Sequence, residues 1–144
     1  MNVYPDSETL IAVMYDIFTR VLREPELLKS VRDGKHLLRI RLSEPDAVLL
    51  LDGRNGPVRF SAVRSGGDDA DVRMHIPAGV LHEVWMGHRR MRDAYMAGEM
   101  KLESNPLKAL GLLNGVVDLF RFVESIYPGI LREYDLLEPA GSGS

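Results

Sequence analysis

The spacing of apolar side chains divides the chain into a helical start, a strand-rich middle and a helical second half. Before Pro25 the apolar residues follow the helical spacing i, i+3, i+4, i+7, i+8 and i+11; they are Leu10, Val13, Met14, Ile17, Phe18 and Val21. This spacing predicts an amphipathic helix of about five turns, with Asp6 or Ser7 as its N-cap. The segment Glu26 to Asp33 is expected to add a short second helix, ended by Gly34.

Four strands are predicted next. A period of two indicates those at residues 38–42, 58–62 and 72–76, and a short apolar run indicates the one at 48–51. In the first of them, leucine and isoleucine alternate with Arg39 and Arg41, which is typical of a strand with one face in solvent. Val48–Leu51 is apolar throughout, which favours an inner strand. Turn residues cluster at 52–57 and 65–69. Short turns between consecutive strands favour an antiparallel meander.

Helical spacing returns after Pro77. A helix that ends near Gly87 is predicted by apolar or aromatic residues at i, i+3, i+4 and i+7, namely Leu81, Val84, Trp85 and His88. A second short helix is expected from Met91 to Gly98. Alternation in Glu99–Glu103 then predicts a fifth strand. The chain therefore combines one sheet with helices that come before and after the strands in the sequence.

A long final helix is predicted from Asn105-Pro106, as N-cap and first helical residue, towards Ser125, with Pro128-Gly129 breaking it and a last helical turn or two in 130–137. Its polar residues fall in one narrow arc; they are Asn114, Asp118, Arg121 and Ser125. The apolar arc is therefore wider than the stripe of about 100° found on a one-sided surface helix. One interpretation is a central helix that neighbouring elements bury. The other is that one flank packs on the sheet while the second lines a cavity or a dimer interface.

Methionines gather in the same half of the chain. Four of the seven lie between Met86 and Met100, beside Trp85 and Tyr95. Methionine is flexible and polarizable, so it suits a surface that accepts apolar ligands of varied shape, although ordinary core filling explains any single one equally well.

Composition narrows the class of protein. The 144 residues, 45% hydrophobic and 27% charged, fit one domain over 1–138, and the tail 139–144 is expected to be flexible. A net charge of −3 gives no bulk attraction to nucleic acid. The absence of cysteine excludes a disulfide framework and a thiol nucleophile. The N-terminus has no signal-peptide pattern, and no apolar run reaches the roughly 20 residues of a membrane span, so a cytoplasmic location is expected.

Motifs for catalysis are missing from the sequence. His82 and His88 are six residues apart, which places them about 120° apart on a helix, so neither a metal site nor a cofactor is expected. No Gly-rich phosphate loop or Gly-x-Ser-x-Gly elbow is present. An enzyme using His75, His82 or His88 with a carboxylate has no supporting spacing. The basic run His88–Arg90 with Arg92 is typical of a solvated connection, and its second interpretation is transient docking on an anionic membrane.

Three segments of the second half resemble the sterol carrier protein type 2 (sterol-binding) domain: LHEVWMG at 81–87, AYMAGEMKLESN at 94–105 and ALGLL at 109–113. The upstream order also fits, with a first helix, a run of strands and Asp-Val-x-Met-x-Ile at 71–76, so that the resemblance covers about residues 7 to 125. Ser104 departs from the glycine that the family often has there, and the chain lacks a C-terminal Ser-Lys-Leu address.

The resemblance implies an α+β fold, in which a five-stranded, mostly antiparallel sheet covered by helices encloses an apolar cavity. It also implies binding or transfer of a sterol, fatty acid, acyl-CoA or other lipid without catalysis, or else a role as a dimerising module.

We therefore expect a non-catalytic binder of a lipid or other hydrophobic small molecule. The alternative is a protein-interaction module, or homodimer, in which a second chain covers the apolar face of 94–124. Tyr95 or His75 is the expected polar contact to a ligand. The candidate ligand-binding residues are Phe60, Met74, Trp85, Met86, Tyr95, Met96, Met100, Leu113, Val117 and Phe120.

Overall fold

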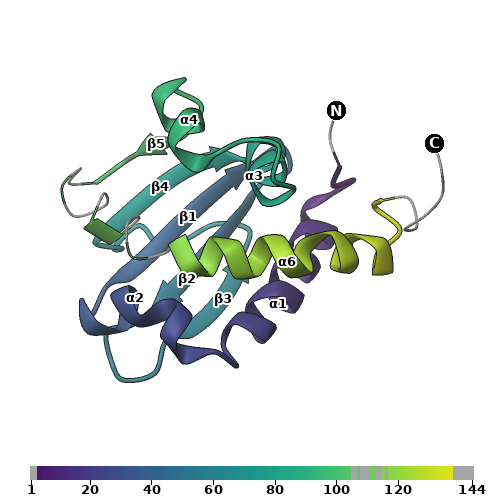
Figure 1. Ribbon diagram of the computed structural model, residues 1–144. Helices are drawn as coiled ribbons and strands as arrows, with labels where there is room; N and C mark the ends of the chain where they lie inside the picture. The colour runs from purple at the N-terminus through teal and green to yellow at the C-terminus, as the bar shows by residue number, and fades with distance from the viewer. Residues whose placement is uncertain (1–2, 105–106, 108–110, 113–114, 116, 138–144) are drawn as a thin grey trace.

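A five-stranded sheet with helices lying across one of its faces forms the body of the computed structural model (Figure 1). The structure describes residues 3–104, 107, 111–112, 115 and 117–137. The predicted tail 139–144 and the candidate Leu113 lie outside these residues. The elements are α1 (Ser7–Val21), η1 (Pro25–Leu28), α2 (Lys29–Asp33), β1 (Leu37–Ser43), β2 (Ala47–Asp52), β3 (Arg59–Val63), β4 (Val72–Pro77), α3 (Ala78–Trp85), α4 (Met91–Met96), β5 (Lys101–Leu102) and α6 (Val117–Glu133).

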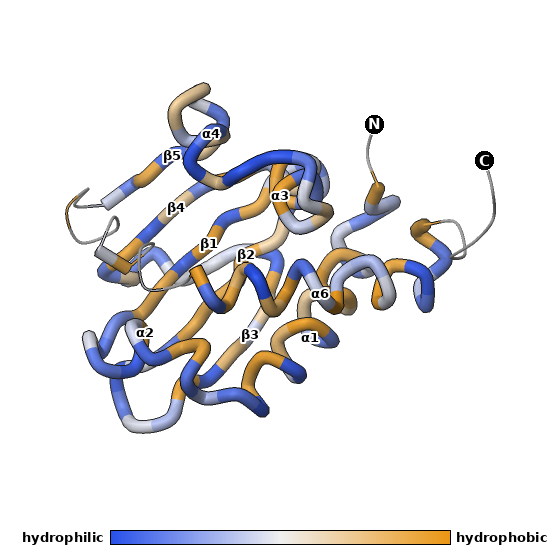
Figure 2. The backbone as a smooth tube through the Cα atoms, in the orientation of Figure 1, coloured by the Kyte–Doolittle hydropathy of each residue, from blue (hydrophilic) through white to orange (hydrophobic). Residues whose placement is uncertain are grey.

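The first helix follows the predicted spacing. All six residues at the helical positions of α1 are buried, with Leu10, Val13 and Ile17 at 0% exposure. Asp6 is the N-cap, and its Oδ1 accepts a hydrogen bond from the Thr9 N–H at 2.7 Å. The buried face of α1 contacts β2, β3 and α6, so this helix holds the sheet and the C-terminal helix together. In Figure 2 the apolar stripe of α1 faces the apolar strands.

The strand order is β3-β2-β1-β4-β5, which corrects the predicted meander. Neighbouring strands are antiparallel except for β1 and β4, which are parallel, with Leu38 opposite Val72. Hydrogen bonds at the start of both strands stabilise this placement. Asp71 Oδ1 accepts from the Leu37 N–H at 2.6 Å, and Asp71 Oδ2 lies 2.9 Å from His36 Nδ1. The chain after β3 therefore crosses to the free edge of β1 instead of turning back beside β3.

Helix α6 corrects the prediction of a break at Pro128-Gly129, because it continues through both residues to Glu133. A proline inside a helix removes one backbone hydrogen bond and costs about 3 kcal/mol. Ile130 and Leu131, both at 0% exposure, follow directly, and burying two such side chains contributes about 3–6 kcal/mol. Tertiary packing therefore outweighs the local penalty. Just before α6, Gly115 lies in a turn.

Helix length bears on the membrane question. Among the helices that the structure describes, none is both long enough and apolar enough to span a bilayer.

Candidate functional site

A small apolar pocket lies between the sheet and the helices that cover it. It has a volume of about 30 Å³, close to the share of liquid volume of one water molecule. Its wall comes from α1, three strands, α3, the start of α4 and α6, so it draws on segments from nearly the whole chain. The lining side chains are all apolar: Phe18, Leu38, Ile40, Leu51, Met74, Ile76, Leu81, Trp85, Met91, Leu112, Leu119 and Phe120.

Three of the candidate ligand-binding residues line this pocket. Met74 comes from β4, Trp85 from the end of α3 and Phe120 from α6, and the structure brings them together across the sheet–helix interface. Phe60 lies one layer further out, where its ring stacks on that of Phe18 at 4.5 Å between centroids. Met100 is buried in the same core but does not line the pocket.

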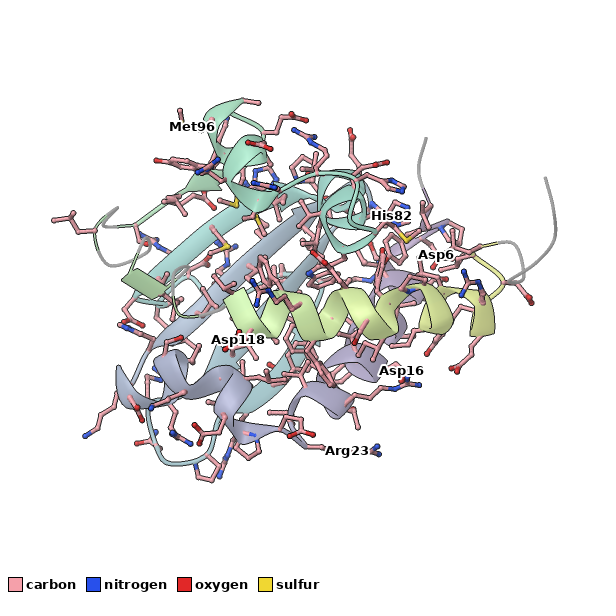
Figure 3. The ribbon with its side chains drawn as sticks, viewed as in Figure 1. Asp6, Asp16, Arg23, His82, Met96 and Asp118 are labelled. Carbon is pink, nitrogen blue, oxygen red and sulfur yellow. The ribbon has the colours of Figure 1, made fainter. Side chains whose placement is uncertain are left out.

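The remaining described candidates lie away from the pocket. Met86 is half-buried against the core, whereas Tyr95 and Met96 are exposed on α4, at 37% and 77%. Figure 3 places Met96 at the outer edge of the molecule. Val117, at the first turn of α6, is 49% exposed and lines a different, outer pocket.

The sequence interpretation did not single out most of the pocket wall. Ile40 and Met74 are register partners on neighbouring strands, and Ile76 lies on the same face two residues further on. The alternation of residues in β1 and β4 could have identified these wall residues. Once one face of β4 is assigned to the core, the pairing of the two strands fixes which residues of β1 lie on the same face.

Trp85 is the centre of the aromatic part of this site. Its ring lies 6.5 Å from that of Phe18, 6.4 Å from that of Phe120 and 5.5 Å from that of Tyr127. The side chain is 3% exposed, and its indole Nε1 has no hydrogen-bond acceptor among the described residues. A buried donor without an acceptor is energetically unfavourable. Such unpaired donors are common at sites that receive a ligand group or a water molecule.

A chain of buried hydrogen bonds joins α3, α6 and the N-terminal segment beside the pocket. The hydroxyls of Tyr4 and Tyr127 lie 2.6 Å apart, and the Tyr127 hydroxyl lies 2.8 Å from His82 Nδ1. Burial raises the pKa of both tyrosines and lowers the pKa of His82, so all three side chains are neutral near pH 7. This network joins α6 to α3 and to the N-terminal segment.

An outer pocket of about 550 Å³ adjoins the apolar one and opens to solvent. It is lined by Val84, Arg89, Arg90, Met91, Val117, Phe120, Arg121 and Glu124. Met91 and Phe120 line both pockets. The basic outer space and the apolar inner one therefore meet at these two side chains, which we call the partition.

A third, open groove of about 560 Å³ lies between the loop after α1, α2 and the turn between β2 and β3. Leu22, Leu28 and Val58 supply its apolar surface, and Arg32 and Lys35 are among its basic residues. It contains none of the candidate residues and shares no lining residue with the other two pockets. Although it is the larger space, its openness and its paired charges make it a weaker candidate for an apolar ligand than the pocket at Trp85.

The histidines considered for catalysis are not brought together. His75 Nε2 lies 3.0 Å from Ser43 Oγ, His82 bonds to Tyr127, and His88 Nδ1 lies 2.9 Å from Glu83 Oε2 at the surface. Burial and the nearby Arg41 lower the pKa of His75. In the described part of the chain, no group of three metal-ligating side chains is present.

Comparisons with known proteins agree on the fold. Residues 17–114 match the family model described as the SCP-2 sterol transfer family. No curated protein sequence matches the chain.

Solved structures give the same result. The crystal structure of sterol carrier protein 2 is 18% identical over 78% of this chain and 93% of its own, with a TM-score of 0.60. The apo form of sterol carrier protein 2 from Yarrowia lipolytica is 16% identical over 92% of this chain and 96% of its own, with a TM-score of 0.52. Palmitated SCP2L2 from Aedes aegypti is 14% identical over 72% and 93%, with a TM-score of 0.50. The predicted sterol carrier protein-like sheet, mostly antiparallel and covered by helices, is confirmed.

Proposed function

The chain belongs to the SCP-2 sterol transfer family, and from that premise we propose that it binds a lipid or another hydrophobic small molecule, without catalysis, in the apolar pocket beside Trp85. The observation that carries the proposal is the pocket wall: twelve apolar side chains from both halves of the chain meet at one point. A related protein of the same fold, SCP2L2 from Aedes aegypti, is described as palmitated.

The pocket must enlarge to hold such a ligand. Its volume of about 30 Å³ is far below the roughly 300–1,000 Å³ of typical small-molecule sites. Leu119 and Phe120 of α6 line this pocket, in the space that an acyl chain or a sterol ring would take. Binding requires α6 to move outward, or these side chains to change rotamer.

Burial of apolar surface drives the binding. Removing roughly 300 Å² of ligand hydrocarbon from water contributes 7–8 kcal/mol at the usual 25 cal/mol per Å². Part of this free energy is spent on opening the pocket.

The test is native mass spectrometry of the purified protein together with a titration of cis-parinaric acid, whose fluorescence rises in apolar surroundings. We expect saturable binding that a large side chain at Leu119 weakens, whereas Met96→Ala, at an exposed position outside the pocket, leaves it unchanged. Circular dichroism shows whether Leu119→Trp is folded. Absence of both co-purified lipid and saturable binding in the native chain contradicts the proposal.

A protein-interaction module is the second candidate, favoured by one observation. The three large apolar side chains with the highest exposed fractions among the described residues are Met96 at 77%, Leu107 at 82% and Val117 at 49%, and all three lie in the second half of the chain. Light scattering separates the two functions: a dimer that forms without ligand supports the module, and a monomer that binds cis-parinaric acid opposes it.

A further inference from the structure

The partition between the two adjoining pockets indicates how a ligand lies in the site. Met91 is the first residue of α4 and Phe120 belongs to α6, and both side chains line the inner apolar pocket and the outer basic one. If either side chain turns aside, the two spaces become continuous. The outer pocket is therefore the direct approach from solvent to the lipid site proposed above.

The charges of the outer pocket are unequal. Arg89 is neutralised, because its guanidinium makes two hydrogen bonds to the carboxylate of Glu99, one of them at 2.9 Å. Arg90 and Arg121 line the same pocket, and neither forms an ion pair with a carboxylate of the described residues. Glu124 is the acidic residue of the lining. Two available guanidinium groups against one carboxylate leave the outer pocket positive.

We propose that the outer pocket binds the anionic head group, a carboxylate or a phosphate, of an amphipathic ligand whose apolar chain occupies the inner pocket. Arg90 and Arg121 contact the head group from opposite sides, one from the loop before α4 and one from α6. This inference rests on the proposed function, and it adds the charge, the orientation and the recognition residues of the ligand. Arginine suits the role because its planar guanidinium donates two parallel hydrogen bonds to a carboxylate or phosphate.

The opposite orientation is unfavourable. Among the described residues, no polar atom lines the inner pocket, so a charged head group placed there loses its hydration and gains no ionic partner from them. The single indole N–H of Trp85 does not replace a hydration shell. The head group therefore stays outside the partition of Met91 and Phe120, and the chain enters first.

The groove near α2 also carries basic residues, but both of its arginines form ion pairs with carboxylates. Arg32 pairs with Glu26 and Asp33, and Arg54 pairs with Asp52 and Asp69. Lys35 is the remaining basic residue of that lining, and no apolar pocket adjoins it through a shared residue. Of the three pockets described above, the outer pocket beside Arg90 and Arg121 is the one that offers a place for both ends of an amphipathic anion.

The experiment compares cis-parinaric acid with its methyl ester, which has the same chain and no charge. Native protein is expected to bind the acid more tightly than the ester. Arg90→Gln and Arg121→Gln are each expected to weaken the acid about threefold to fivefold, which is the range of one exposed charge pair, and to leave the ester unchanged. Arg23→Gln is the matched control, since Arg23 is exposed at the end of α1, far from Met96 and α4 (Figure 3).

Further arms separate the outcomes. Glu124→Gln is expected to strengthen binding of the acid, because it removes the carboxylate of the lining. Inorganic phosphate, compared with chloride at equal ionic strength, tests the anion site itself: competition with the acid that is lost in Arg90→Gln and Arg121→Gln supports the proposal, whereas competition that persists in both variants overturns it. Lys35→Gln tests the groove near α2, and a selective loss of acid binding in that variant also overturns the proposal.

Failure of this inference differs from failure of the proposed function. Equal, saturable binding of acid and ester, unaffected at Arg90 and Arg121, overturns the head-group site and leaves lipid binding intact. Absence of saturable binding of either probe contradicts the proposed function and, with it, the head-group site.

Discussion

The hydroxyl of Tyr127 is the point at which α6 is joined to the rest of the molecule by buried polar contacts, so Tyr127→Phe is a sharp perturbation. The substitution removes one oxygen atom and keeps the ring, which lies 5.5 Å from that of Trp85. Two hydrogen bonds are lost, the 2.6 Å contact with Tyr4 and the 2.8 Å contact with His82. Tyr127 is fully buried and His82 is 8% exposed, so water does not replace the missing partner easily.

The expected magnitude follows from these contacts. A buried polar group that loses its partner costs about 1–3 kcal/mol. Because one hydroxyl serves two partners, we expect Tyr127→Phe to lower the free energy of unfolding by roughly 2–4 kcal/mol. A loss of this size is a large part of the 5–15 kcal/mol typical of a domain.

Urea unfolding measures the change, and the single tryptophan, Trp85, reports on it by fluorescence from within the affected region. Tyr95→Phe is the matched control, because it removes the same atom from a side chain that is 37% exposed; its effect should stay within about 0.5 kcal/mol. Equal stabilities of Tyr127→Phe and Tyr95→Phe would refute the reasoning, since the buried network would then contribute nothing.

Three further predictions test other parts of the structure. Burial lowers the pKa of His82 in the folded state, so the stability that its neutral form provides is present above the unfolded pKa of about 6.5 and is lost as pH falls below it. Urea unfolding between pH 7 and 5 should therefore show a smaller loss of unfolding free energy for His82→Gln than for native protein. His75→Gln is measured beside it, because burial lowers the pKa of His75 too. Asp71→Ala removes the acceptor that aligns the starts of β1 and β4, and we expect it to lower the free energy of unfolding by about 1–3 kcal/mol; unchanged urea midpoints would contradict the role assigned to this carboxylate. Gly53→Ala places a Cβ in a steric clash with the backbone oxygen of Val31, and calorimetry should show a loss of about 1–3 kcal/mol in the free energy of unfolding. Gly79→Ala, with open space around its Cβ, should show no such loss.

Local pattern was sufficient for most of the elements. The helical spacing from Leu10 to Val21 predicted the buried face of α1, and the alternation in β1 and β4 predicted their strands. Pairing of β4 with β1 was missed because it depends on Asp71, whose carboxylate meets Leu37 and His36 only after the chain has crossed the sheet. No spacing rule connects residues 34 positions apart.

The end of α6 shows a second limit. Pro128-Gly129 is a strong local signal for a helix end, and the prediction was wrong because Ile130 and Leu131 are buried beyond it. Propensity describes a helix in isolation, whereas the neighbours of α6 decide its length.

Most of the candidate ligand-binding residues were chosen for their aromatic or sulfur-containing side chains, and their role in binding stays a prediction. Of them, Met74, Trp85 and Phe120 line the inner pocket. The same wall contains leucines and isoleucines such as Leu38 and Ile40. Nothing in these residue types distinguishes a side chain that lines a pocket from one in the ordinary core. That distinction depends on how α6 packs over the sheet, which the sequence pattern does not contain.

Energy transfer from Trp85 to bound cis-parinaric acid tests the central claim most directly, because Trp85 is the only tryptophan and lines the inner pocket. If the pocket beside Trp85 receives the chain of a lipid, tryptophan emission falls and probe emission rises in parallel. Both changes saturate at one probe per protein, and hexadecanol reverses them. A folded protein whose tryptophan emission shows no saturable transfer to the probe would contradict the account.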